Sequence, residues 1–112
     1  MKIYHNPRCR KSRETLSLIQ ENGITPEIVL YLEDTPSRSE LTEIIEMLGI
    51  SPMDLIRRGE AVFKENFKGK DLTDKEWIEA MVNFPKLIER PIVVKGGKAI
   101  IGRPPENVRQ LF

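Results

Sequence analysis

The residues that could carry chemistry gather near the N-terminus, in the stretch IYHNPRCRKSRETL at positions 3–16. This stretch holds the chain's one cysteine, Cys9, and its one histidine, His5. Ser12 completes a Cys-x-x-Ser spacing, in which a hydroxyl in the first turn of a helix can donate to the sulfur. A thiolate in such a setting is both a nucleophile and a leaving group in thiol chemistry.

The setting of Cys9 depends on a strand-to-helix turn. If the turn after the first strand ends at Cys9, the sulfur lies at a helix N-terminus, where unpaired amides and the helix dipole favour an anion. A free cysteine has a pKa of about 8.5, and neighbouring cations lower it. Arg10, Lys11 and Arg13 follow directly. The pattern therefore favours a reactive thiolate.

Two plainer interpretations stay open at this point. A lone cysteine is often a small buried apolar residue, although Arg8 and Arg10 on either side of Cys9 fit an apolar core poorly. His5 could bond a backbone carbonyl at the end of a strand, or it could hold or balance the thiolate.

Three arginines further along the chain could bind an oxyanion. Arg57 lies in DLIRRGE, Arg90 precedes Pro91, and Arg103 precedes Pro104. A residue before proline is held in an extended conformation, and a guanidinium offers planar paired donors to oxyanions. Most arginines are simply solvated, so the residues alone propose an anion near a thiolate and go no further.

Composition describes an ordinary globular chain of 112 residues with 39% hydrophobic and 31% charged residues. The net charge of +1, with lysines and glutamates interspersed, gives no reason to expect nucleic-acid binding. No apolar run approaches the roughly 20 residues of a membrane span, and the N-terminus lacks the apolar centre of a signal peptide. We therefore expect a cytoplasmic protein that does not contact a membrane.

The cysteine count constrains the chemistry. One cysteine excludes an intramolecular disulfide, and one cysteine with one histidine predicts no metal site. Any redox reaction at Cys9 must therefore take its second thiol from another molecule.

The first part of the chain predicts a parallel crossover unit. A short strand at 2–5 leads through the Asn-Pro turn into a helix over 10–22, which Gly23 ends. The stretch 26–32 is rich in β-branched and aromatic residues and predicts a second strand. A strand, a helix and a strand this close together favour a right-handed parallel arrangement.

The rest of the chain predicts helices and then a hairpin. Capping boxes at 37–40 and 73–76 and Pro52 each mark a helix start, and 64–72 is predicted to be an exposed, mobile connection. Two strands, 90–95 and 98–102, flank a Gly-Gly turn, and a short helix follows. The sum is one α/β domain over 1–112: a thioredoxin-like mixed sheet of about four strands (β-α-β, then β-β-α) with a helical insertion at about 35–86.

Several segments in order resemble the glutaredoxin-linked arsenate reductase family: IYHNPRCRKSRETL, ITPEIVLYLEDTPSRSEL, LGISPMDLIRRGE, LIERPIVV and IIGRPPENV. The match runs from residue 3 to the C-terminus and implies a thioredoxin-like fold with a helical insertion. The family's nucleophilic cysteine corresponds to Cys9. The arginines that surround its oxyanion correspond to Arg57, Arg90 and Arg103.

The resemblance also assigns supporting residues and partners. His5 and Ser12 correspond to the residues beside the family's sulfur, and Pro91 to its cis-proline. The implied reaction is attack of Cys9 on arsenate to give a thiol-arsenate adduct, with glutathione as co-substrate, glutaredoxin as reductant and no bound cofactor. We expect a monomer. The sequence departs from the family pattern at Arg10 and Lys11, where characterised reductases usually carry small residues.

Two other functions stay open. A related branch of the family binds RNA polymerase as a redox-responsive regulator, but it typically lacks the arginine at position 103 and needs two cysteines. A general glutathione-linked thiol transferase would suit Cys-x-x-Ser, but it would not explain the three arginines.

Overall fold

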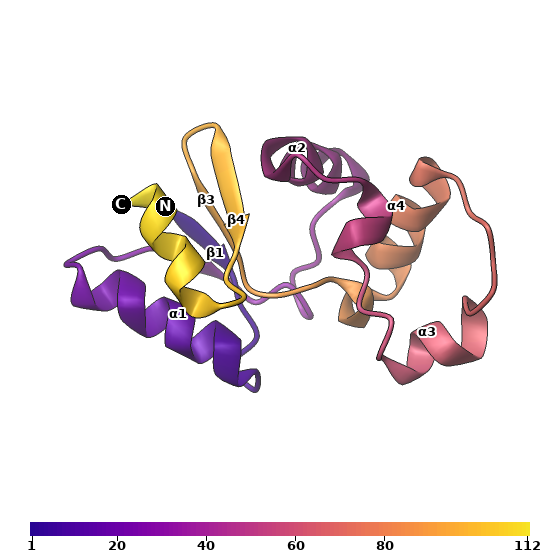
Figure 1. The fold of residues 1–112 in the computed structure, drawn as a ribbon, viewed down its shortest axis with the longest axis horizontal. Coiled ribbons are helices and arrows are strands. Elements are labelled where there is room, and N and C mark those ends of the chain that lie inside the picture. The colour runs from indigo at the N-terminus through magenta and orange to yellow at the C-terminus, as the bar shows by residue number, and fades with distance from the viewer. The chain divides into compact units, whose positions relative to one another are not determined.

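The computed structural model describes residues 1–112 and divides the chain into two compact units (Figure 1). Unit 1 is formed by both ends of the chain, Met1–Asp34 and Arg90–Phe112, and unit 2 by Thr35–Glu89. The expectation that 1–112 is one domain stays a prediction. None of the helices has the length and apolar character required to cross a membrane.

Unit 1 is built on a four-stranded mixed sheet in the order β2-β1-β3-β4. Its strands are β1 (Lys2–Tyr4), β2 (Glu27–Val29), β3 (Ile92–Lys95) and β4 (Lys98–Ile101). β1 pairs parallel with β2, and the helix α1 (Arg10–Glu21) connects the two strands. β3 pairs antiparallel with both β1 and β4. The predicted α/β class and four-stranded mixed sheet are confirmed.

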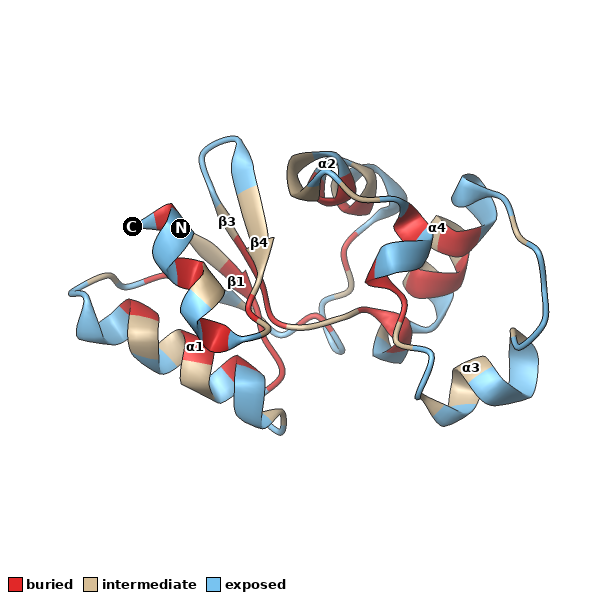
Figure 2. Ribbon diagram, in the orientation of Figure 1, coloured by how far each residue is buried: buried red, intermediate tan, exposed pale blue.

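The core of unit 1 lies on one face of this sheet, under α1 and η3 (Pro105–Leu111), a 3-10 helix. Ile3 and Val93 are partners in the β1–β3 register, so their side chains share a face. Both are fully buried with Ile19 of α1 and Val108 of η3. Figure 2 shows the buried residues in β1 and β3 and at intervals along the two helices.

The boundaries of α1 follow local rules. Cys9 is its N-cap in extended backbone, and no side chain caps the helix there. At the other end Gly23 takes a left-handed φ of 75°, and its amide donates to the Gln20 carbonyl at 3.0 Å. The predicted helix stop is confirmed, because this conformation favours glycine.

The buried face of α1 is more polar than its sequence pattern predicts. Ile19 is buried, whereas Leu16 and Leu18, the other apolar residues of the helix, are only partly buried. Ser12 and Thr15 are instead fully buried. Periodicity of apolar residues gives no signal for such positions.

Unit 2 is helical. Its elements are α2 (Arg38–Leu48), η1 (Pro52–Leu55), α3 (Ala61–Asn66), α4 (Asp74–Asn83) and η2 (Pro85–Leu87). The predicted caps are present: the Ser37 hydroxyl accepts from the Glu40 amide at 3.2 Å, and Thr73 forms the full capping box that begins α4. The short helices predicted after Ser51 and near the C-terminus form as 3-10 helices.

The strand predicted over 26–32 is wrong in its second half. β2 ends at Val29, because the amides of Glu33 and Asp34 turn back to the Leu30 carbonyl at 2.9 and 2.8 Å. Main-chain turn bonds therefore override the β propensity of the residues that follow.

The connection predicted over 64–72 is also shorter than expected. α3 continues to Asn66, and Phe67 packs against the rings of Trp77 and Phe84 with centroids 6.1 and 5.7 Å apart. Most of this segment is exposed, as predicted.

One close approach ties α1 to the end of β4. Gly102 donates its amide to the Pro91 carbonyl at 2.9 Å and accepts from the Thr15 hydroxyl at 3.4 Å. A Cβ at position 102 would lie 2.5 Å from Thr15 Oγ1 and 2.7 Å from Pro91 Cγ. The absence of a side chain here lets the segment that carries Arg103 lie directly on α1.

We predict that Gly102→Ala lowers the free energy of unfolding by about 1–3 kcal/mol, the usual cost of overpacking a filled site. Urea denaturation followed by circular dichroism measures this. Gly97→Ala is the control, because a Cβ there meets nothing within 4 Å. Equal stability of the two variants would contradict the prediction.

Candidate active site

The loop before α1 presents Cys9 to the first turn of the helix. Its amide donates to the Asn6 carbonyl at 3.0 Å, and the Asn6 side chain accepts from the Arg8 amide at 3.0 Å. These bonds fix the turn, so Cys9 sits as the N-cap with a half-buried side chain. The Ser12 amide of the first turn lowers the pKa of the Cys9 thiol.

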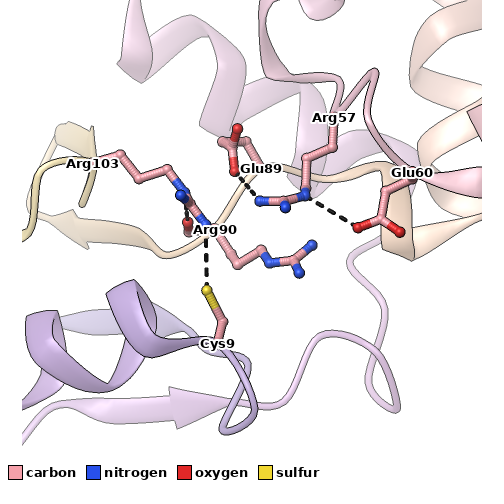
Figure 3. A network of polar contacts seen from close by, with 6 residues as sticks. All are labelled: Cys9, Arg57, Glu60, Glu89, Arg90 and Arg103. Carbon is pink, nitrogen blue, oxygen red and sulfur yellow. Dashed lines mark hydrogen bonds and ion pairs between the residues drawn. The ribbon is translucent and has the colours of Figure 1, made fainter.

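Arg103 holds its charge next to this sulfur. Its Nη2 lies 3.4 Å from Cys9 Sγ, and its Nε donates to the Arg90 carbonyl at 2.8 Å (Figure 3). Its own carbonyl accepts from the Asn107 side chain at 3.1 Å. The guanidinium is therefore held by the Arg90 carbonyl and the sulfur, while Asn107 holds the backbone that carries it. The peptide bonds before Pro91 and Pro104 are both cis.

The electrostatics around Cys9 favour its charged form. Burial raises the pKa of the Cys9 thiol, but hydrogen bonds from the Ser12 amide and the Arg90 side chain lower it, together with the positive charges of Arg103 and Arg90. The balance leaves the pKa below its ordinary value. The fraction of nucleophilic thiolate at neutral pH rises accordingly.

Ser12 supports the site in a different way from the one predicted. Its hydroxyl is fully buried, lies 2.6 Å from His5 Nδ1 and accepts from the Asn6 amide at 3.0 Å. Burial and the charge of Arg13 lower the pKa of His5, which favours the neutral ring. A neutral Nδ1 can accept the single proton of the Ser12 hydroxyl, so the hydroxyl donates to His5. The Ser12 amide, and not the hydroxyl, therefore acts on the sulfur.

Arg57 belongs to unit 2, where two carboxylates hold it. Its Nη1 pairs with Glu89 at 2.7 Å and its Nε with Glu60 at 3.3 Å (Figure 3). Its amide also donates to the Leu87 carbonyl at 2.7 Å. Cys9, Arg90 and Arg103 come together within unit 1, whereas the contribution of Arg57 to an oxyanion site stays a prediction.

The cations that follow Cys9 are partly held by neighbours. Arg10 pairs with Glu14 one turn along α1 at 2.8 Å, and Arg13 donates to the Pro7 carbonyl at 2.9 Å. Lys11 is exposed. The Arg10 side chain thus pairs along the helix and stays exposed.

Sequence reasoning missed Asn6 and Asn107, which shape the loop of Cys9 and the segment of Arg103. Asn6 had a signal, since the Asn-Pro pair marks a turn. Asn107 had none, because its amide bonds the carbonyls of Ile101 and Arg103, whose placement depends on the folded hairpin.

The mixed four-stranded sheet, with a cysteine at the start of the helix after its first strand, defines a thioredoxin-like protein with a thiol site. The ArsC family model matches residues 4–111. The chain belongs to the ArsC family.

Named relatives are similar over nearly the whole chain. The "Uncharacterized protein YfgD" of Escherichia coli is 52% identical, covering 99% of this chain and 95% of that protein. An "Arsenate reductase" of Haemophilus influenzae is 46% identical, covering 98% and 97%. The solved "Arsenate reductase from Vibrio cholerae" superposes with a TM-score of 0.95 at 46% identity, covering 99% and 96%.

We predict that Arg103→Ala raises the pKa of Cys9, because the nearest guanidinium is lost from the sulfur. The rate of alkylation by iodoacetamide, measured against pH, reports this pKa through the thiolate fraction. Iodoacetamide is neutral, so steering by charge does not enter. Arg109→Ala, which removes one exposed charge from η3, should leave the profile in place. Identical profiles for the two variants would contradict the role of Arg103.

We predict that Ser12→Ala lowers the free energy of unfolding by about 1–3 kcal/mol, since it removes the partner of His5 Nδ1 and of the Asn6 amide in a buried site. Chemical denaturation measures the loss. Ser17→Ala, at an exposed position of the same helix, is the matched control. A loss no larger than that of the control would rule out a structural role for the Ser12 hydroxyl.

Proposed function

We propose that this chain reduces arsenate to arsenite, with Cys9 as the nucleophile. The observation that carries the proposal is the fixed Arg103 guanidinium 3.4 Å from the Cys9 sulfur, because it places a cation where a thiolate must meet an anion. The named arsenate reductases at 46% identity over nearly the full length support it.

The first step forms the bond between sulfur and arsenic. The Cys9 thiolate attacks arsenic, and one arsenate oxygen leaves as water after taking up two protons. Arsenic stays pentavalent. Arg103 and Arg90 offset the negative charge that the oxyanion brings close to the thiolate. Because these donors are already in place, they stabilise the charge without the reorganisation that water would need. We include Arg57 as the third oxyanion contact.

The second step transfers electrons. The thiolate of glutathione attacks the Cys9 sulfur, so an S–S bond forms and the S–As bond breaks. The electron pair of the broken S–As bond stays on arsenic, which leaves as arsenite. The two sulfurs are oxidised to a mixed disulfide. Glutaredoxin then restores the Cys9 thiolate. The external reductant follows from the single cysteine, and we place this cycle in a cytoplasmic monomer without a bound cofactor.

His5 and Ser12 support the site by holding the loop before α1 in place. The Ser12 hydroxyl bonds His5 Nδ1 and accepts from the Asn6 amide, which holds the loop that presents Cys9. We infer that they keep the sulfur at the helix start through the cycle, and that the Ser12 amide stabilises each thiolate state.

The test is NADPH oxidation coupled through glutathione, glutaredoxin and glutathione reductase, with arsenate as substrate. We expect arsenate-dependent oxidation by the wild-type chain and none by Cys9→Ser. Arg103→Ala should lower kcat/KM by about 100-fold, the typical loss when one donor to a developing charge is removed. Arg109→Ala should stay within about twofold, as surface changes usually do.

The alternatives give different results in the same assay. Oxidation with a glutathionylated disulfide and none with arsenate would contradict the proposal and select a thiol transferase. Retention of RNA polymerase on the immobilised chain, with no oxidation in either assay, would select the regulator.

A further inference from the structure

The charge of the chain is divided unevenly between its two units. Unit 1 carries ten Lys and Arg against six Asp and Glu, a net charge of +4, and unit 2 carries eight against eleven, a net charge of −3. The overall charge of +1 conceals this difference. The interspersed charges expected from the sequence therefore hold for the chain as a whole, while the cations gather in the unit that contains Cys9.

Four of these cations lie close together in sequence, and we call them the cationic rim: Arg8, Arg10, Lys11 and Arg13. All four are exposed and they lie on both sides of Cys9 in sequence. One carboxylate, Glu14, pairs with Arg10, so positions 8–14 keep a net charge of +3.

The helix dipole does not explain the rim. The positive end of a helix dipole favours acidic side chains in the first turn. α2 has Glu40 there, and α4 has Asp74 and Glu76. α1 has no acidic residue in its first turn and places Arg10 and Lys11 there instead. Departures from local rules of this kind are expected at functional sites.

The rim lies in sequence on both sides of Cys9, which needs a thiol from another molecule. Its sulfur is half-buried, and the chain offers no second thiol. A reductant protein must therefore bring its own thiol to Cys9, and its surface must lie against the exposed residues that flank the sulfur. A surface of net charge +3 attracts an acidic partner and repels a basic one.

We propose that the cationic rim is the docking surface for the acidic face of a dithiol oxidoreductase protein, which reduces a mixed disulfide on Cys9. This inference rests on the redox role proposed for Cys9 and names how its protein partner is selected. The partner's first thiolate attacks the mixed disulfide and Cys9 leaves as thiolate. The partner's second thiol then closes its own disulfide and releases the small thiol. Two electrons pass from the partner's dithiol to the mixed disulfide. The partner's two protons go to the two released thiolates, in exchange with solvent.

The experiment starts from a mixed disulfide made chemically, so it does not depend on arsenate. Cys9 is capped with neutral 2-mercaptoethanol through its disulfide. Release of Cys9 is then followed by stopped flow with an acidic glutaredoxin, with free glutathione and with neutral dithiothreitol. If the chain does not reduce arsenate, the release of Cys9 can still be measured. If the rim variants do not slow this release, the result of the arsenate assay is unaffected.

The test variant is Arg10→Glu with Lys11→Glu, and Arg10→Gln with Lys11→Gln is a milder second variant. Lys95→Glu with Lys98→Glu is the matched control. It makes the same charge change in unit 1 at the hairpin turn, next to the Lys2 end of β1, whereas Cys9 follows the opposite end.

We expect the Glu variant to slow reduction by glutaredoxin about tenfold or more at about 20 mM salt, with a smaller loss for the Gln variant. The difference should shrink at about 0.5 M salt, where screening is strong. Reduction by dithiothreitol should change less than about twofold, as should every rate of the control, because surface changes away from a contact have small effects.

Four results would overturn the proposal. Equal slowing in the test and control variants would show an effect of net charge alone. Equal slowing with dithiothreitol would show altered reactivity of the sulfur. Equal slowing with glutathione would assign the rim to a small anionic thiol, and no slowing with glutaredoxin would leave the rim without a docking role.

Discussion

A cation held against a sulfur at the start of a helix is the constraint on which unit 1 depends. Burying a thiol raises its pKa, so a reactive thiolate needs compensation that does not move. The first turn of α1 supplies an amide, and the end of β4 supplies the Arg103 guanidinium. The Nε bond of Arg103 to the Arg90 carbonyl, and the bond from Asn107 to its own carbonyl, keep that charge in place.

The sheet brings those two elements together. Arg103 is 94 residues from Cys9 in sequence, and β3 and β4 return the end of the chain to the sheet that β1 began. Gly102 then lets the last segment contact Thr15 and Pro91 without a side chain between them. The core under α1 and η3 stabilises this arrangement, and the same close packing limits how far Arg103 can move.

Local rules predicted the elements better than they predicted the contacts. Caps at Ser37 and Thr73 and the stop at Gly23 depend on residues close in sequence, and each was predicted correctly. The end of β2 was not predicted, because turn bonds to Leu30 overrode strand propensity. The location of Cys9 at the helix start could be predicted, since turn and helix signals surround it. Its bond to Arg103 could not, because no local pattern reports a contact between residues so distant in sequence.

The same distinction explains Ser12 and the charges. A Cys-x-x-Ser spacing predicted a hydroxyl directed at the sulfur, but the buried His5 and the Asn6 amide both need that hydroxyl. The division of charge between the units depends on which segments fold together, so overall composition cannot reveal it. Once the units are known, the excess of cations is found in the unit that contains Cys9.

The most direct test of the account is a crystal of the chain soaked in arsenate, with diffraction collected at the arsenic absorption edge. We predict an anomalous peak at bonding distance from Cys9 Sγ, with arsenate oxygens contacted by Arg90 and Arg103. The same map shows directly whether Arg57 contacts the arsenate. Arsenic bound elsewhere with Cys9 unmodified, or bound at Cys9 with both guanidinium groups turned away, would contradict the account.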